Sequence, residues 1–166
     1  MKWLLPVFAP EVLVSTKSPE DQLASFLAKF TPEIESLAHA ILLKMCARYP
    51  SALELVYDNY NALAIGFGPS ERVSETTFSI AVYPKWVSLF FLQANRGLPD
   101  PENLLKGSGN VVRHIRLPSA ASLDEQAVRA LMLEAESRAV RPFDPKGVYR
   151  LVIKSISAKQ RPRRPS

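Results

Sequence analysis

Cysteine is almost absent from this chain of 166 residues, since Cys46 is the only one. A single thiol cannot form an internal disulfide, which agrees with a reducing compartment. Long apolar runs are missing too, because no stretch approaches the roughly 20 apolar residues that span a bilayer. Pro6, Pro10 and Glu11 interrupt the apolar start, and no small-residue cleavage site follows it, so we expect no secretory signal. We predict a cytoplasmic protein with an N-terminal extension at residues 1–16.

Motifs of common enzyme classes are also missing. The sequence has no Gly-x-Ser-x-Gly elbow, no Walker loop and no dinucleotide fingerprint. His39 and His114 are the only histidines, and Glu35 with His39 supplies two metal ligands where zinc sites use three or four. Cys46, near the end of an apolar helix, is expected to pack as a small hydrophobe. Absent motifs leave other enzymes open, but we predict a non-enzymatic protein with no catalytic residue, metal or cofactor.

Net positive charge is confined to the C-terminal part of the chain, although the formal net charge of the whole chain is +5. Residues 146–166 contain seven basic groups and no acid, whereas the rest of the chain has 14 basic and 16 acidic groups. The basic balance therefore describes the C-terminal residues and not a nucleic-acid-binding fold. Residues 158–166 carry no packing signal and are predicted to form a mobile tail. The cations through which this tail would contact nucleic acid are Lys159, Arg161, Arg163 and Arg164.

Two helix signals open the body of the chain. Ser18-Pro19 and Thr31-Pro32 each place a capping hydroxyl before a proline, with acids following in the first turn. Apolar residues then recur at helical spacing until Pro50, which marks the end of the second helix. We therefore predict two helices before the first strand.

From Leu53 the apolar period changes from 3.6 to 2, which predicts strands. Four strands are expected at "LELVYDN", "NALAIGF", "TTFSIAVY" and "WVSLFFLQ", with a tight connection at residues 83–86. Ala62, Ala64 and Gly66 fall on one face of the second strand, so that a helix or a ligand can approach it closely. Further on we expect a one-turn helix at residues 100–105, a fifth strand at "NVVRHIRL", a helix at 122–139 and a sixth strand at "GVYRLVIKSIS".

These elements predict an α+β fold: an antiparallel sheet of about five strands flanked by N-terminal helices and a C-terminal helix. We see no internal repeat and no flexible linker that would divide the chain. Residues 17–157 are therefore expected to form a single domain.

The stretch "LLKGSGNVVRHIRL", residues 104–117, contains the candidate ligand-binding residues. A phosphate loop runs from a strand through glycines into a helix, whereas here a short helix comes first and a strand follows. Gly107 is therefore expected to take the left-handed conformation that ends a helix, and Gly109 to free the chain for the strand. Arg113 is our candidate for an anion contact in a cleft, with Glu54 or Asp58 as the alternative internal partner. Arg116 lies on the opposite strand face, beside His114.

Aromatic residues gather on the predicted strands, where two interpretations compete. Exposed sheet aromatics can stack on the bases of single-stranded nucleic acid, whereas buried ones fill a core. Because Lys85 alone among the basic residues stands beside an aromatic, core packing is preferred. The residues concerned are Tyr57, Tyr60, Phe67, Phe78, Tyr83, Trp86, Phe90 and Phe91.

Several phrases resemble the YdhG-like domain family, small bacterial proteins of largely unassigned function. They are "YDNYNALAIGFG", "YPKWVSLFFLQ", "LPDPENLLKGSGNVVRHIRL" and "LVIKSISAKQRPRRP". The resemblance implies a frataxin-like arrangement of helices flanking an antiparallel sheet, and it brings no catalytic motif. Some members are described as iron chaperones. Because the acids of this chain are scattered, we do not carry the iron-binding role over to it. We expect a binding module for a small anionic or metal-bearing ligand, with a nucleic-acid-associated protein as the alternative.

Overall fold

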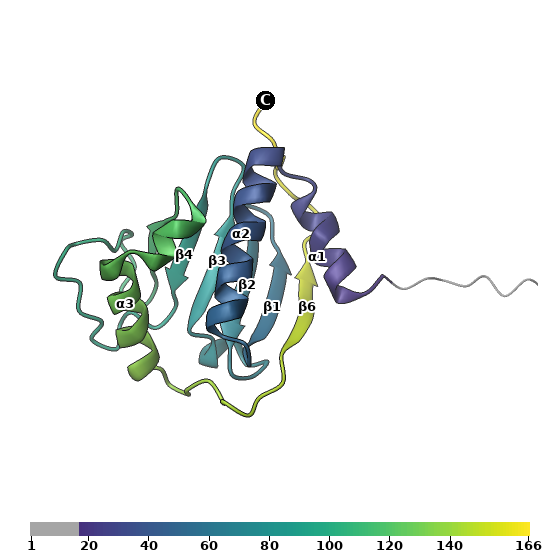
Figure 1. The fold of residues 1–166 in the computed structure, drawn as a ribbon. Coiled ribbons are helices and arrows are strands. Elements are labelled where there is room, and N and C mark those ends of the chain that lie inside the picture. Colours follow the sequence, from purple (N-terminus) through teal and green to yellow (C-terminus); the bar gives the residue numbers. More distant parts are fainter. Residues whose placement is uncertain (1–16) are drawn as a thin grey trace, which may run out of the picture.

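A six-stranded sheet forms the body of the molecule, and three α-helices cover one of its faces (Figure 1). The structure, a computed structural model, describes residues 17–166. The predicted extension at residues 1–16 lies outside the described residues. The predicted α+β class is confirmed, and the sheet has six strands where about five were expected, because the segment "GVYRLVIKSIS" joins it. Within residues 17–166, no helix combines the length and hydrophobicity that crossing a membrane requires.

The two N-terminal helices begin where the sequence predicted. In α1 (Pro19–Leu27) the Ser18 hydroxyl accepts a hydrogen bond from the Asp21 amide at 3.1 Å. In α2 (Pro32–Arg48) the Thr31 hydroxyl accepts one from the Ile34 amide at 3.4 Å. Each cap satisfies an amide that has no partner within its helix. The buried residues that the two helices turn toward the sheet are Leu23, Phe26, Leu27, Ile34, Ala38, Ile41, Leu42 and Met45.

The first five strands lie in the sheet as an antiparallel meander, and the sixth joins the far edge. The order across the sheet is β5-β4-β3-β2-β1-β6, and β6 runs parallel to β1. The chain returns from the β5 edge to the β1 side before it forms β6. The strands are β1 (Leu53–Asp58), β2 (Leu63–Gly68), β3 (Phe78–Val82), β4 (Val87–Phe91), β5 (Arg113–Arg116) and β6 (Arg150–Ile156).

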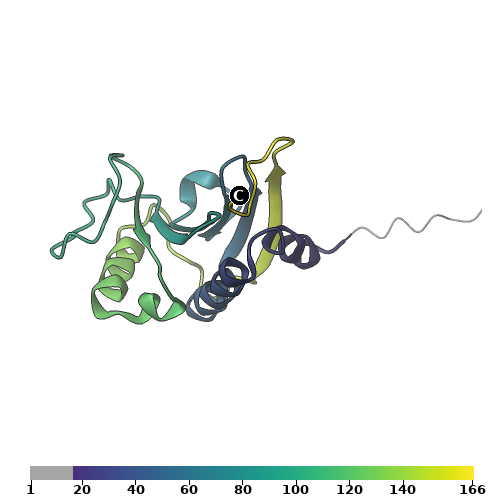
Figure 2. The same cartoon turned by 90° about the horizontal axis from the view of Figure 1, so that it is seen from above.

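The core lies between the sheet and the helices, because alternate strand residues point to that side. Val56, Ile65, Ile80 and Leu89 form one cross-strand row, and all four are fully buried. Burying each such side chain contributes about 1.5–3 kcal/mol. The opposite face has no α-helix above it in the described chain, only the short η1 (Val73–Glu75) near one end (Figure 2).

The connection from β5 to β6 contains the third helix, with a break that the sequence did not predict. A 3-10 turn, η2 (Ala120–Asp124), precedes α3 (Gln126–Ser137), and the extended backbone of Glu125 separates them. The residues predicted to face inward are buried as expected: Leu123, Val128, Leu131 and Met132.

Residues 100–105 form a turn, so the predicted one-turn helix is wrong. The Asp100 carboxylate accepts hydrogen bonds from the amides of Leu104 and Leu105 at 2.8 and 2.9 Å. A side chain thus takes the backbone donors that a helix would have paired with carbonyls, which is the usual competition between Asp and regular structure.

The C-terminal segment, residues 157–164, packs on the domain, so the predicted free tail is corrected. The amide of Ser157 donates to the Asp58 carbonyl, and that of Arg161 to the Tyr60 carbonyl, both at 2.9 Å. Arg163 is 5% exposed, whereas a solvated tail would expose such a side chain fully. The segment runs past the ends of β1 and β6 (Figure 1).

Candidate functional site

The open face of the sheet carries a shallow hollow made of two adjoining parts, which we call the sheet hollow. One part measures about 520 Å³ and the other about 680 Å³. Both lie within the range of roughly 300–1,000 Å³ that is usual for small-ligand sites. Asn61 and Tyr83 line both parts. The first, uncharged part is further lined by Asn59, Tyr60, Ala62, Ala64, Ser79, Ala81, Phe90, Leu92 and Ser157. The second, cationic part is further lined by Pro84, Lys85, Trp86, Arg161 and Pro162.

Small side chains of two neighbouring strands form the floor of the uncharged part. Ala64 of β2 pairs directly with Ala81 of β3, and both belong to the face away from the helices. Ala62 and Ser79 extend this floor. The sequence prediction of a small-residue face on the second strand is confirmed, and the sheet hollow exists because no larger side chain fills that space.

Aromatic rings stand around this floor and on the adjoining strand ends. Tyr83 and Trp86, from the tight connection between β3 and β4, are stacked with centroids 5.0 Å apart. Phe90 is stacked on His114 at the same separation, across the pair β4 and β5. The preference for core packing holds for Phe67, Phe78 and Phe91, which are buried, but not for the aromatics that line the hollow.

Cations accompany these rings, contrary to the expectation that Lys85 alone would do so. The Arg116 guanidinium lies 4.4 Å from the ring centre of Trp86, and that of Arg161 lies 5.6 Å from the ring centre of Tyr60. Lys85 and Arg161 line the cationic part, and no Asp or Glu lines either part. The electrostatic potential of the sheet hollow therefore favours an anion.

His114 adds little charge to this surface. Burial lowers the pKa of His114, and the nearby Arg113 and Arg116 guanidinium groups lower it further. The imidazole is therefore neutral at pH 7, and it contributes a flat ring beside Phe90.

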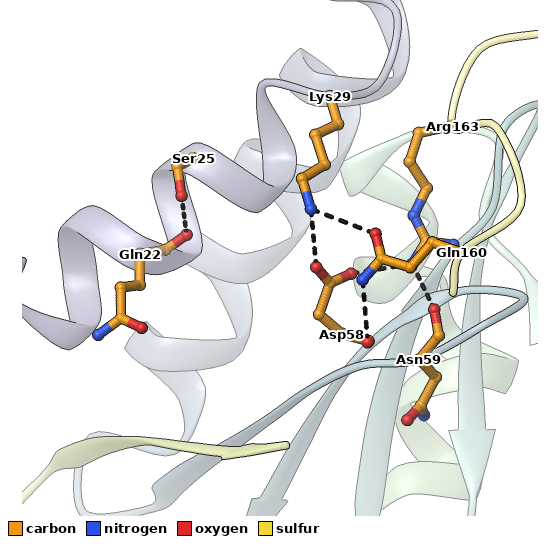
Figure 3. A network of polar contacts seen from close by, with 7 residues as sticks. All are labelled: Gln22, Ser25, Lys29, Asp58, Asn59, Gln160 and Arg163. Atoms are coloured by element: carbon orange, nitrogen blue, oxygen red, sulfur yellow. Dashed lines mark hydrogen bonds and ion pairs between the residues drawn. The ribbon is translucent and has the colours of Figure 1, made fainter. Parts of the chain in front are cut away.

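The position of Arg161 depends on the polar network that holds the C-terminal segment (Figure 3). Arg163 Nη2 donates to Asp58 Oδ1 at 2.8 Å, and Lys29 Nζ donates to Asp58 Oδ2 at 2.9 Å. Arg163 also donates to the Asn59 carbonyl, and Gln160 to the Asp58 carbonyl at 3.2 Å. Because these contacts hold the residues on either side of it, Arg161 stays at the rim of the sheet hollow.

Asp58 carries the negative charge of this network. Burial alone would raise the pKa of Asp58, but hydrogen bonds from Gln160, Lys29 and Arg163 outweigh it and hold the pKa below its ordinary value of 3.8. The carboxylate is therefore ionised between two cations. Arg163 Nη2 donates to both Asp58 and the Asn59 carbonyl, whereas Arg163 Nε and Nη1 are buried without a hydrogen-bond partner in the described part of the chain.

Glu54 is a second buried carboxyl on the same strand, and its partners are neutral. Tyr149 donates to Glu54 Oε2 at 2.5 Å, and the Cys46 thiol donates to Glu54 Oε1 at 3.3 Å. Burial raises the pKa of Glu54, and the donors offset this only in part. Burial, with the nearby Glu54, also raises the pKa of the Cys46 thiol to about 12. Cys46 is therefore a protonated donor at neutral pH, more than the simple hydrophobe that the sequence suggested.

Arg113 contacts neither of the carboxylates predicted for it. Its guanidinium donates to the backbone carbonyls of Leu105 and Lys106, both at 3.2 Å. Arg113 belongs to the same cross-strand row as Glu54, but four strand spacings, about 19 Å, separate them. The partner prediction was therefore wrong, and Arg113 secures the turn before β5.

Gly107 and Gly109 belong to the loop that leads into β5 and lie apart from the sheet hollow. Gly107 has a φ of +107°, so the predicted positive φ is confirmed, although no helix precedes it. Lys106 and His114 exchange two backbone hydrogen bonds across the loop, at 2.8 and 3.0 Å. The backbone geometry of the loop therefore accounts for the presence of Gly107 and Gly109. Of the four predicted ligand residues, only Arg116 lies beside the site.

Metal-ligating side chains are dispersed in the described part of the chain. Among residues 17–166, no group of three His, Cys, Asp or Glu side chains lies close enough to hold a metal ion. His39 Nε2 stands 3.9 Å from Glu35 Oε1 on the outer surface of α2, as their spacing indicated.

A smaller apolar hollow of about 230 Å³ lies between α3 and the loop at residues 99–104. Of the three acidic residues that line it, Asp100 caps the turn and Glu134 pairs with Arg138 at 3.1 Å. Fewer polar groups converge here than at the sheet hollow, so it is the weaker candidate.

Comparison with known proteins does not identify a relative for this chain. No family model matches the sequence, and neither the curated proteins nor the solved structures give a match. The site is therefore defined by its own geometry.

Proposed function

We propose that this protein is a cytoplasmic, non-enzymatic binding module whose sheet hollow takes a small organic anion. One observation carries the proposal: cations and aromatics converge on the hollow while no acid lines it. An apolar floor beside charged donors suits a ligand with an uncharged body and an anionic end. The cytoplasmic location agrees with a lone Cys46 that is held as a thiol.

Membership of the YdhG-like family is part of this proposal. The quoted phrases resemble that family, and helices beside a largely antiparallel sheet agree with the arrangement that it implies. Three of those phrases contribute to the sheet hollow. "YDNYNALAIGFG" includes Asn61 and Ala64, "YPKWVSLFFLQ" includes Tyr83 and Lys85, and "LVIKSISAKQRPRRP" includes Arg161.

Binding of nucleic acid through the C-terminal segment alone has less support. Of its four cations, Arg163 is buried against Asp58, and Arg164 donates to the carbonyls of Ala28, Lys29 and Phe30. Only Lys159 and Arg161 remain directed to solvent without such contacts. Because two of its four cations are bound to its own domain, this segment has few charges left for phosphates. Its affinity for nucleic acid should therefore be weak and should change little with salt concentration.

Removing the two lining cations tests the proposed function. We would measure binding of ribose phosphate at low salt by isothermal titration calorimetry, using the parent and the double variant Lys85→Gln/Arg161→Gln. Because each cation offers a charge-assisted hydrogen bond to the phosphate, the affinity should fall roughly tenfold or more. Native mass spectrometry of the purified parent would identify any anion that it retains.

A matched control separates a local contact from general charge. The double variant Arg129→Gln/Lys146→Gln removes the same charge from exposed positions outside the hollow, and it should bind as the parent does. Equal loss in both variants, or no binding of any organic anion by the parent, would refute the proposed function.

A further inference from the structure

The two parts of the sheet hollow differ in chemistry, and this difference restricts the ligand beyond its charge. The part of about 520 Å³ contains no charged side chain among its lining residues. The adjoining part contains Lys85 and Arg161. A ligand that occupies both therefore has a neutral body and a charged end, held about the shared residues Asn61 and Tyr83.

The shape and lining of the uncharged part favour a flat ring. Its floor is the pair Ala64 and Ala81 on neighbouring strands, where no side chain longer than a methyl group rises from the sheet. Tyr83 and Phe90, both half-buried, stand beside this floor with ring surface exposed. Nucleobases stack on aromatic rings that a sheet presents, so Tyr83 and Phe90 can supply that contact at the edge of the flat floor.

Polar groups at the rim fit the edge of a base. Asn59 and Asn61, in the turn between β1 and β2, are exposed, and their amides offer donors and an acceptor. In Figure 3 the side chain of Asn59 points away from the Asp58 network, which uses only its backbone carbonyl. These amides can therefore bind the donors and acceptors of a base without breaking an internal contact.

From these observations we propose that the ligand of the sheet hollow is a nucleotide. The base lies over Ala64 and Ala81 beside Tyr83, and the phosphate lies in the cationic part against Lys85 and Arg161. The inference rests on the proposed function, because it specifies the anion that the same surface binds. A free nucleotide and a nucleotide unit within a single strand present the same chemistry, and the experiment distinguishes them.

The test compares ligands that share a phosphate and differ in the body. Calorimetry with the parent protein would use a nucleoside monophosphate, ribose phosphate, octyl phosphate and a single-stranded oligonucleotide. The nucleoside monophosphate should bind roughly tenfold more tightly than ribose phosphate, because only it can stack. An oligonucleotide that binds more tightly still, in proportion to its length, would identify a strand as the source.

A variant of the floor gives a second readout. Ala64→Leu places a larger side chain where the base is proposed to lie, and it should abolish the roughly tenfold advantage of the nucleoside monophosphate over ribose phosphate. Ala24→Leu, an equal change at an exposed position of α1, is the control and should keep that advantage.

The outcomes separate this inference from the proposed function. Equal binding of ribose phosphate and the nucleoside monophosphate, or octyl phosphate binding as tightly as the nucleotide, would overturn the base site while leaving an anion site. Retention of the nucleotide advantage in Ala64→Leu would overturn the assigned position of the base. No binding of any phosphate would refute the proposed function itself.

Discussion

Glu54 and Asp58 lie on the helix-covered face of one strand, yet their surroundings differ in charge. Asp58 is placed between Lys29 and Arg163, so its carboxylate is stabilised although it is fully buried. Glu54 meets only a phenol and a thiol, so burial dominates and its pKa rises. Two acids of the same strand should therefore give opposite pH dependences of stability.

Removing the charge of Asp58 should destabilise the domain strongly. Asp58→Asn leaves the buried Arg163 guanidinium without its counter-charge, and breaking a buried pair in this way typically costs about 3–5 kcal/mol. The free energy of unfolding, measured with urea, should fall by that amount at pH 7. The lowered pKa of Asp58 means that its contribution is complete above the ordinary value of 3.8, and is lost as the pH falls through the lower pKa of the folded state.

A double variant identifies the pair as the cause. Replacing both partners, Asp58→Asn with Arg163→Met, removes the uncompensated charge, so its loss should be smaller than the sum of the two single losses. Strict additivity would show that the two side chains do not stabilise each other.

Glu54→Gln should have the opposite effect. The amide can still accept from Tyr149 and carries no charge to desolvate, so the melting temperature at pH 8 should rise by roughly 2–4 °C. Because the pKa of Glu54 is raised in the folded state, its contribution to stability is complete below the ordinary value of 4.5 and is lost as the pH rises through the folded pKa. The variant should lack this decline. Glu33→Gln, a control change at an exposed position of α2, should keep the decline in stability with rising pH. A melting temperature of Glu54→Gln below that of the parent at pH 8 would contradict this prediction.

At the scale of elements, Gly107 has a positive φ in the last part of the loop before β5. Gly107→Ala forces a Cβ into a conformation that costs about 1–2 kcal/mol for other residues. Urea denaturation should show that loss, with phosphate binding unchanged, whereas the exposed neighbour Ser108→Ala should affect neither. A drop in phosphate affinity at unchanged stability would instead place these glycines in an anion site.

Elements with strong local signals could be predicted from the sequence, and those decided by distant contacts could not. Capping hydroxyls and prolines located the starts of α1 and α2, because the cap and the helix lie within one turn. The turn at residues 100–105 was misjudged, since the Asp100 side chain competes for the amides that the pattern assigned to a helix. Strand β5 is only four residues long, although the alternating pattern was twice that length.

At the scale of the whole molecule, the sequence predicted the small-residue floor of the sheet hollow but not the cations beside its aromatic rings. Because side chains alternate between the two faces of a strand, Ala62 and Ala64 were placed on one face, which predicted a surface that a ligand can approach closely. It could not show that Arg161 would meet Tyr60 or that Arg116 would meet Trp86, because these contacts depend on tertiary packing. The basic C-terminal segment was predicted to be free for the same reason, since its partner Asp58 is close in space but 105 residues away in the sequence.

During synthesis, strands β1 to β5 leave the ribosome in the order in which they lie across the sheet, so each can pair soon after it emerges. β6 does not follow that order, because its neighbour β1 is made before all of β2–β5 and α3. α1, made earlier still, packs on β6 (Figure 1), and the carbonyls of residues 28–30 that follow α1 accept hydrogen bonds from Arg164. A nascent chain that stops short of residue 150 therefore presents the apolar side of α1 and an unpaired strand edge together, which is the kind of surface that chaperones bind.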